Sequence, residues 1–76
     1  MLSFRGMAKS ELLDYNGAIS DFSKSIEINP NDANAFFYRG MAKGNLRQLE
    51  SSCLDFSKAG ELGLEKAYKA IKKFCN

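Results

Sequence analysis

The 76-residue sequence contains no histidine, and it has only two cysteines and one proline. Histidine is the commonest general base and the commonest metal ligand, so its absence removes the simplest basis for acid–base catalysis or for a bound transition metal. The cysteines, Cys53 and Cys75, lie far apart and lack the Cys-x-x-Cys spacing of zinc sites, and a structural zinc needs four ligands. We therefore expect neither a metal nor a cofactor.

Long apolar runs and a glycine-rich phosphate loop are also missing. No stretch approaches the roughly 18 apolar residues of a transmembrane helix, and the first residues lack the charged start and apolar core of a secretion signal. The formal net charge of +2 is too small to indicate nucleic-acid binding by itself. The carboxylates are spread along the chain, and no nucleophile has an evident basic partner. We therefore expect that the protein is not an enzyme. We also expect it to be cytoplasmic, unless a secretion signal lies upstream.

What the sequence does contain is an internal repeat. Residues 6–9 (Gly-Met-Ala-Lys) recur at 40–43, and residues 21–24 (Asp-Phe-Ser-Lys) recur at 55–58, which is an offset of 34 residues in both cases. A fixed period of this length is typical of helical repeat proteins. The length indicates a single domain over residues 1–76, with a first repeat over about 1–31 and a second over about 32–63.

Apolar residues three and four positions apart predict five helices. The first covers residues 2–13, and the second has its apolar stripe over 18–28. The third follows Asp32 and runs to about residue 43, the fourth runs from about 46 or 48 to 62, and the fifth from 64 to about 74. Asp14, in a predicted turn over residues 14–17, and Asp32 are suited to cap the second and third helices. Pro30 should end the second helix, because proline cannot continue helical hydrogen bonding. Gly63 fits the left-handed position that closes many helices.

The residues at fixed places in each repeat resemble the tetratricopeptide repeat family. That family has a large aromatic residue, then Leu-Gly two residues on, then Tyr, then Ala-x3-Phe and a closing Pro. The first repeat here reads Leu2-x2-Arg5-Gly6-x2-Lys9, then Ala18-x3-Phe22 and Pro30, and the second reads Phe36-x2-Arg39-Gly40-x2-Lys43, then Ser52-x3-Phe56. Arginine replaces leucine and lysine replaces tyrosine in both repeats, so we interpret the pattern as a variant. The Arg-Gly pair, and the ending at residues 58–63 followed by a short helix and a cysteine, are similar to bacterial members.

The resemblance implies an all-α fold. It would be an α–α superhelix, a TPR solenoid of two antiparallel helix hairpins followed by a fifth, capping helix over about 64–75. Gly6 and Gly40 should lie where the two helices of a hairpin approach closely, with Phe22 and Phe56 between successive hairpins. A chain reversal near Gly63 would bring the two cysteines nearly level on antiparallel helices. They could then face each other as thiols, form a disulfide, or be two unrelated buried thiols.

The family holds peptide segments of other proteins on the concave face formed by the first helix of each hairpin. The resemblance therefore implies a protein–protein interaction module whose partner is another protein or a peptide. The side chains transferred to that face are Phe4, Met7, Glu11, Phe37, Tyr38, Met41 and Asn45. Aromatic and methionine side chains suit adaptable peptide contacts, although the aromatic ones could equally serve only to pack neighbouring helices. The lysine–asparagine–arginine clamp of the branch that binds chaperone tails is absent.

The sequence is also consistent with three other functions. The chain could be the structural end-piece of a longer scaffold of such repeats, or a module that forms a homodimer through its first helix. It could also bind nucleic acid or anionic lipid electrostatically through Lys66, Lys69, Lys72 and Lys73. Lysines on the outer face of a terminal helix more often provide the polar surface that repeat arrays need at their ends.

Overall fold

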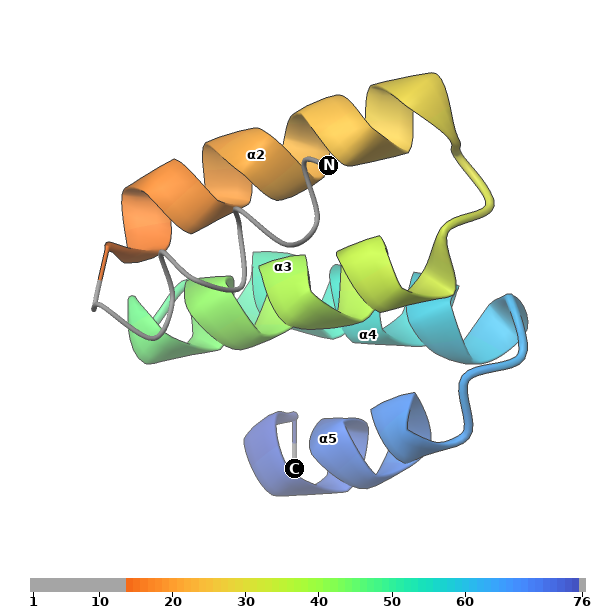
Figure 1. The fold of residues 1–76 in the computed structure, drawn as a ribbon. Helices are drawn as coiled ribbons and strands as arrows, with labels where there is room; N and C mark the ends of the chain where they lie inside the picture. Colours follow the sequence, from red (N-terminus) through yellow and green to blue (C-terminus); the bar gives the residue numbers. More distant parts are fainter. Residues whose placement is uncertain (1–13, 76) are drawn as a thin grey trace.

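The computed structural model describes residues 14–75 of the chain, and all of its regular elements there are helices. They are α2 (Tyr15–Ile28), α3 (Ala33–Asn45), α4 (Leu49–Glu61) and α5 (Lys66–Phe74) (Figure 1). The predicted all-α class is therefore confirmed for this part of the chain. The helix predicted over residues 2–13, together with Phe4, Met7 and Glu11, lies outside the described residues.

The first two of these helices begin at the predicted caps. An Asp14 carboxylate oxygen accepts a hydrogen bond from the Gly17 backbone N–H at 3.0 Å, and Asp32 accepts one from Ala35 at 3.1 Å. Each bond satisfies a backbone donor that has no partner within its own helix. The turn predicted over residues 14–17 was wrong, because the bond from Gly17 to Asp14 belongs to the first turn of α2. The helix ends at Ile28, shortly before Pro30, as predicted.

The turn between α4 and α5 closes on Gly63. This glycine has a φ of 104°, a left-handed conformation that side-chain-bearing residues rarely adopt. Its N–H donates to the carbonyl of Gly60 at 3.0 Å, and the next N–H, of Leu64, donates to the carbonyl of Ala59 at 3.1 Å. These two bonds form the Schellman ending of a helix. The prediction for Gly63 is confirmed, although α5 begins at Lys66 and not at Leu64.

Each described helix packs against the next one along the chain. In Figure 1, α2 and α5 lie on opposite sides of the pair formed by α3 and α4, and α4 lies behind α3. The two phenylalanines that recur 34 residues apart, Phe22 and Phe56, are both fully buried. Phe22 belongs to a small cluster shared by α2 and α3, and Phe56 belongs to a larger one shared by α3, α4 and α5. Within residues 14–75 no helix is long and apolar enough to cross a bilayer.

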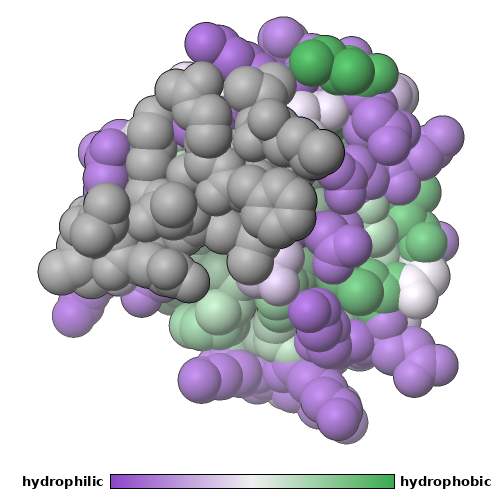
Figure 2. All heavy atoms as spheres, viewed as in Figure 1, coloured by the Kyte–Doolittle hydropathy of each residue, from purple (hydrophilic) through white to green (hydrophobic). Residues whose placement is uncertain are grey.

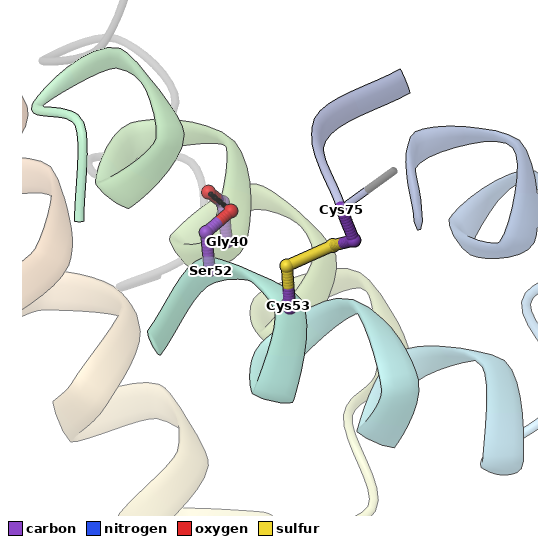
Figure 3. Close-up of a disulfide and its surroundings, with 4 residues drawn as sticks. All are labelled: Gly40, Ser52, Cys53 and Cys75. Atoms are coloured by element: carbon purple, nitrogen blue, oxygen red, sulfur yellow. Dashed lines mark hydrogen bonds between the residues drawn. A yellow bond between two sulfur atoms is a disulfide. The ribbon is translucent and has the colours of Figure 1, made fainter. Parts of the chain in front are cut away.

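Helices α3 and α4 cross closely at Gly40. A methyl group placed there would lie 2.9 Å from a ring carbon of Phe56 and 3.2 Å from the carbonyl oxygen of Ser52. The buried hydroxyl of Ser52 donates to the carbonyl of Gly40 at 2.7 Å, and Figure 3 shows the two residues facing each other. The predicted close approach at Gly40 is therefore confirmed, and the buried Ser52 hydroxyl has a hydrogen-bond partner.

Candidate functional site

One side of α3 carries the four predicted binding residues that fall within the described part of the chain. At 3.6 residues per turn, Met41 and Asn45 lie in the middle of this side, and Phe37 and Tyr38 lie at its two edges. In Figure 1, α3 lies in front of α4. Figure 2, in the same orientation, shows apolar side chains at the surface below the grey atoms, with hydrophilic side chains around them.

The four residues differ in how much of each one solvent can reach. Phe37 is only 9% exposed. Its ring packs edge-on against Tyr38, with centroids 5.3 Å apart, and against Phe56 at 5.6 Å. For Phe37, therefore, the structure shows the packing role that the sequence had left open, and little of its surface remains for a partner.

Tyr38, Met41 and Asn45 are more accessible, and we call them the α3 face. Tyr38 and Met41 are half-buried, because each packs against the core along part of its side chain. The Tyr38 ring also stacks on Phe22 of α2 at 5.9 Å. Asn45 is exposed, and its side-chain amide donates to the carbonyl of Met41 at 3.0 Å. The face thus combines an aromatic ring, a flexible apolar side chain and an amide group.

A lysine from α5 borders this face, and the sequence did not indicate it. The ammonium of Lys66 lies 4.9 Å from the ring centroid of Phe37 and 5.4 Å from that of Tyr38. Both distances are within the range of cation–π attraction. Lys66 is the first residue of α5 and is itself exposed. Sequence reasoning had assigned it only to the outer polar face of the capping helix, because its place beside α3 depends on how α5 docks.

An ion-pair network holds the opposite side of α3 against α4. Asp55 is 4% exposed and binds Arg39 through both carboxylate oxygens, at 2.8 Å from Nε and 2.7 Å from Nη2. The ammonium of Lys43 lies 3.1 Å from the same carboxylate and donates to Ser51 at 2.8 Å. Arg39 also donates to Ser23 of α2 at 3.2 Å. These charges are engaged inside the domain, so they orient α3 rather than offer a ligand site.

The last helix is linked covalently to α4. Cys53 lies within α4 and Cys75 directly follows α5; their Cα atoms are 6.0 Å apart and their sulfur atoms form a disulfide (Figure 3). That separation is normal for disulfides. The prediction that the cysteines lie level on neighbouring helices is confirmed, and of the three states left open the structure shows the disulfide.

The four lysines of α5 are exposed, but two of them already lie over aromatic rings of the domain. Lys66 lies over Phe37 and Tyr38, and Lys73 lies 5.5 Å from the ring centroid of Phe74. No group of three or more acidic or cysteine side chains within residues 14–75 is placed to hold a metal ion.

Comparison of the chain with protein-family models, with curated proteins and with solved structures found no match. What the α3 face does must therefore be inferred from its own side chains and from the helices that position them.

Proposed function

We propose that this chain is a short tetratricopeptide-like interaction module. In this proposal α3 and α4 are the second hairpin of a superhelical array, α2 is the second helix of the first hairpin, and α5 is the fifth, capping helix. The 34-residue repeat and the close crossing at Gly40 support it. The bound partner is a peptide segment of another protein, and the α3 face holds it.

A single observation carries the proposed binding role. Tyr38 and Met41 are held by the core along one part of each side chain and are accessible along the other. Phe22 and Phe37 fix the orientation of the Tyr38 ring, so little conformational entropy is lost when a peptide packs on it. Met41 is flexible and polarisable, which lets it adapt to differently shaped apolar side chains.

The polar groups around these two residues would set the direction of the peptide. Asn45 is exposed beside Met41 and offers an amide to a peptide backbone. Lys66 offers a positive charge at the opposite end of the same surface, next to Tyr38. A face formed by so few residues is small, so we expect weak binding, of the order of micromolar, unless further repeats or a second copy extend it.

The electrostatic alternative has less support in the arrangement of α5. Two of its four lysines lie against aromatic rings of the domain itself. The homodimer alternative requires the chain to self-associate. The scaffold alternative requires further repeats before anything can bind. Light scattering on the isolated chain distinguishes a monomer from a dimer.

The test uses peptides selected from a random displayed library on the immobilised chain. The affinity of each selected synthetic peptide is then measured by fluorescence polarisation. The test variant is Met41→Gln with Lys66→Gln, which leaves the core contacts of Tyr38 in place. The matched control is Leu54→Gln with Lys69→Gln, which makes the same chemical changes at exposed positions away from the α3 face.

We expect the test variant to bind at least tenfold more weakly and the control to change affinity less than twofold. Both should keep their helicity. Equal losses in the two variants, together with a steep dependence on salt, would assign the binding to the basic surface of α5 instead. Failure to select any peptide with the oxidised chain would refute the proposed function.

A further inference from the structure

The disulfide holds the C-terminal end of α5, which would otherwise be free, against α4. At its start, α5 is tethered by the Gly63 turn, and at its end Cys75 is bonded to Cys53 in α4. The bond closes a loop with a sequence separation of 22 residues, and this loop contains the whole of α5. Both cysteines are half-buried residues.

Apart from this bond, α5 is held by an apolar contact of modest size, in which Ile71 and Phe74 are partly buried against the core beside two alanines. It is nine residues long, and helices this short are not stable in water on their own. Its fully packed side chains are Ala67 and Ala70, which bury little apolar surface each. Its aromatic stacking contact is made by Phe74, whose ring centroid lies 5.7 Å from that of Phe56. Phe74 directly precedes Cys75 of the disulfide.

The position of α5 also determines the surroundings of the α3 face. An unbroken series of ring contacts runs from Phe74 through Phe56 and Phe37 to Tyr38, with centroid separations of 5.7, 5.6 and 5.3 Å. The other end of α5 places Lys66 over the last two of these rings. If α5 leaves, the α3 face therefore loses its neighbouring charge, and Phe37 and Phe56 lose part of their cover.

We propose that the disulfide between Cys53 and Cys75 is a redox switch for the α3 face. In the oxidised chain α5 is docked and the face has the geometry described above. A dithiol reductant attacks one sulfur to form a mixed disulfide, and its second thiol displaces the other cysteine. The products are two cysteine thiols and an oxidised reductant, so the electrons and protons balance. Reduction then releases α5 from α4. The importance of this for peptide binding rests on the function proposed above.

The two forms belong to different environments. Glutathione and thioredoxin keep thiols reduced in the cytosol, whereas disulfides persist in secreted and other oxidising compartments. In the cytoplasmic location expected from the sequence, the released form would therefore predominate, and the docked form would require an oxidising compartment.

The experiment compares the oxidised chain with the same chain in excess dithiothreitol. Amide hydrogen exchange is followed for residues 67–74, and NMR reports the Met41 methyl group and the Tyr38 ring. On reduction we expect the α5 amides to exchange roughly 100-fold faster, because the free energy that a disulfide usually contributes corresponds to a factor of this size. We also expect the Met41 and Tyr38 resonances to move, while amide protection in α2 and α3 is kept. Reoxidation should restore the first state.

The variant Cys53→Ser with Cys75→Ser should match the reduced chain and be unaffected by dithiothreitol. If this variant fails to fold, the reversible change in the natural sequence still decides the question. The switch is refuted if α5 stays equally protected after reduction, or if the Met41 and Tyr38 resonances do not move. It is also refuted if all the helices lose protection together, because the bond then stabilises the whole domain. None of these results depends on a peptide, so the peptide selection can fail independently.

Discussion

One methyl group added at Gly40 or at Gly60 should change stability in opposite directions. Both glycines lie within helices, where alanine is favoured over glycine by about 1 kcal/mol. At Gly40 the new carbon would lie 2.9 and 3.0 Å from two ring carbons of Phe56 and 3.2 Å from a backbone oxygen. Phe56 is fully buried between other rings and cannot withdraw. Overpacking of this kind costs about 1–3 kcal/mol, so Gly40→Ala should be destabilising by about 1 kcal/mol net.

At Gly60 the side chain nearest to the added methyl group can move. The nearest atom to the added carbon is Cζ of Tyr68, at 2.7 Å. Tyr68 is 51% exposed, so its ring can rotate further into solvent at little cost. Gly60→Ala should therefore keep most of the gain in helix propensity and stabilise the domain by about 0.5 kcal/mol.

Thermal and urea denaturation followed by circular dichroism measure both variants under oxidising conditions. The two should differ by about 1.5 kcal/mol, which corresponds to roughly 6–12 °C in melting temperature for a domain of this size. If Gly40→Ala melts at or above Gly60→Ala, the close crossing of α3 and α4 is not present in solution. The helix register on which the α3 face depends would then also be wrong.

The remaining predictions concern the ion pairs, the last helix and the disulfide. Asp55→Ala leaves Arg39 and Lys43 largely buried without their carboxylate and should lower the free energy of unfolding by about 3 kcal/mol. In urea denaturation, a loss below 1 kcal/mol would contradict the network. Ala67→Asp puts an unpaired charge between α4 and α5 and should cost several kcal/mol. The exposed control Lys69→Asp should cost less than 1 kcal/mol, and equal losses would show that α5 is not docked. Reduction of the disulfide should lower the free energy that holds α5 against α4 by about 3 kcal/mol, the value expected for a loop of this length. Equal urea dependence of amide exchange in residues 67–74 with and without dithiothreitol would contradict this.

Most helix boundaries could be predicted because their causes are local. A capping aspartate, a proline or a left-handed glycine acts on the few residues around it, as Asp32, Pro30 and Gly63 do here. The turn predicted over residues 14–17 was wrong because Asn16 and Gly17 tolerate both turns and helices. The hydrogen bond from Gly17 to Asp14 decides between them, and residue preference alone does not contain that information.

The candidate site was less predictable, because it depends on how the helices pack. Phe37 and Tyr38 are adjacent, and on a helix they point about 100° apart. The sequence places both at the edges of one side, but the positions of α4 and α5 decide that Phe37 is the buried one. Lys66 was missed for the same reason. Counting residues placed Cys53 and Cys75 level along their helices, yet it could not establish how each helix is rotated and hence whether the sulfur atoms meet.

Two departures from the tetratricopeptide pattern in the second repeat have a common physical cause. Arg39 replaces a usual leucine and Lys43 a usual tyrosine, and in the structure both bind the buried carboxylate of Asp55. Either cation alone would be costly to bury, and so would the carboxylate without them. The two replacements thus belong to one interaction and are not two separate mismatches. The same three residue types precede them by 34 positions, as Arg5, Lys9 and Asp21, and Asp21 is also 4% exposed. Because the two cations and the carboxylate stabilise one another, these two positions count as a single departure when the proposed repeat architecture is weighed.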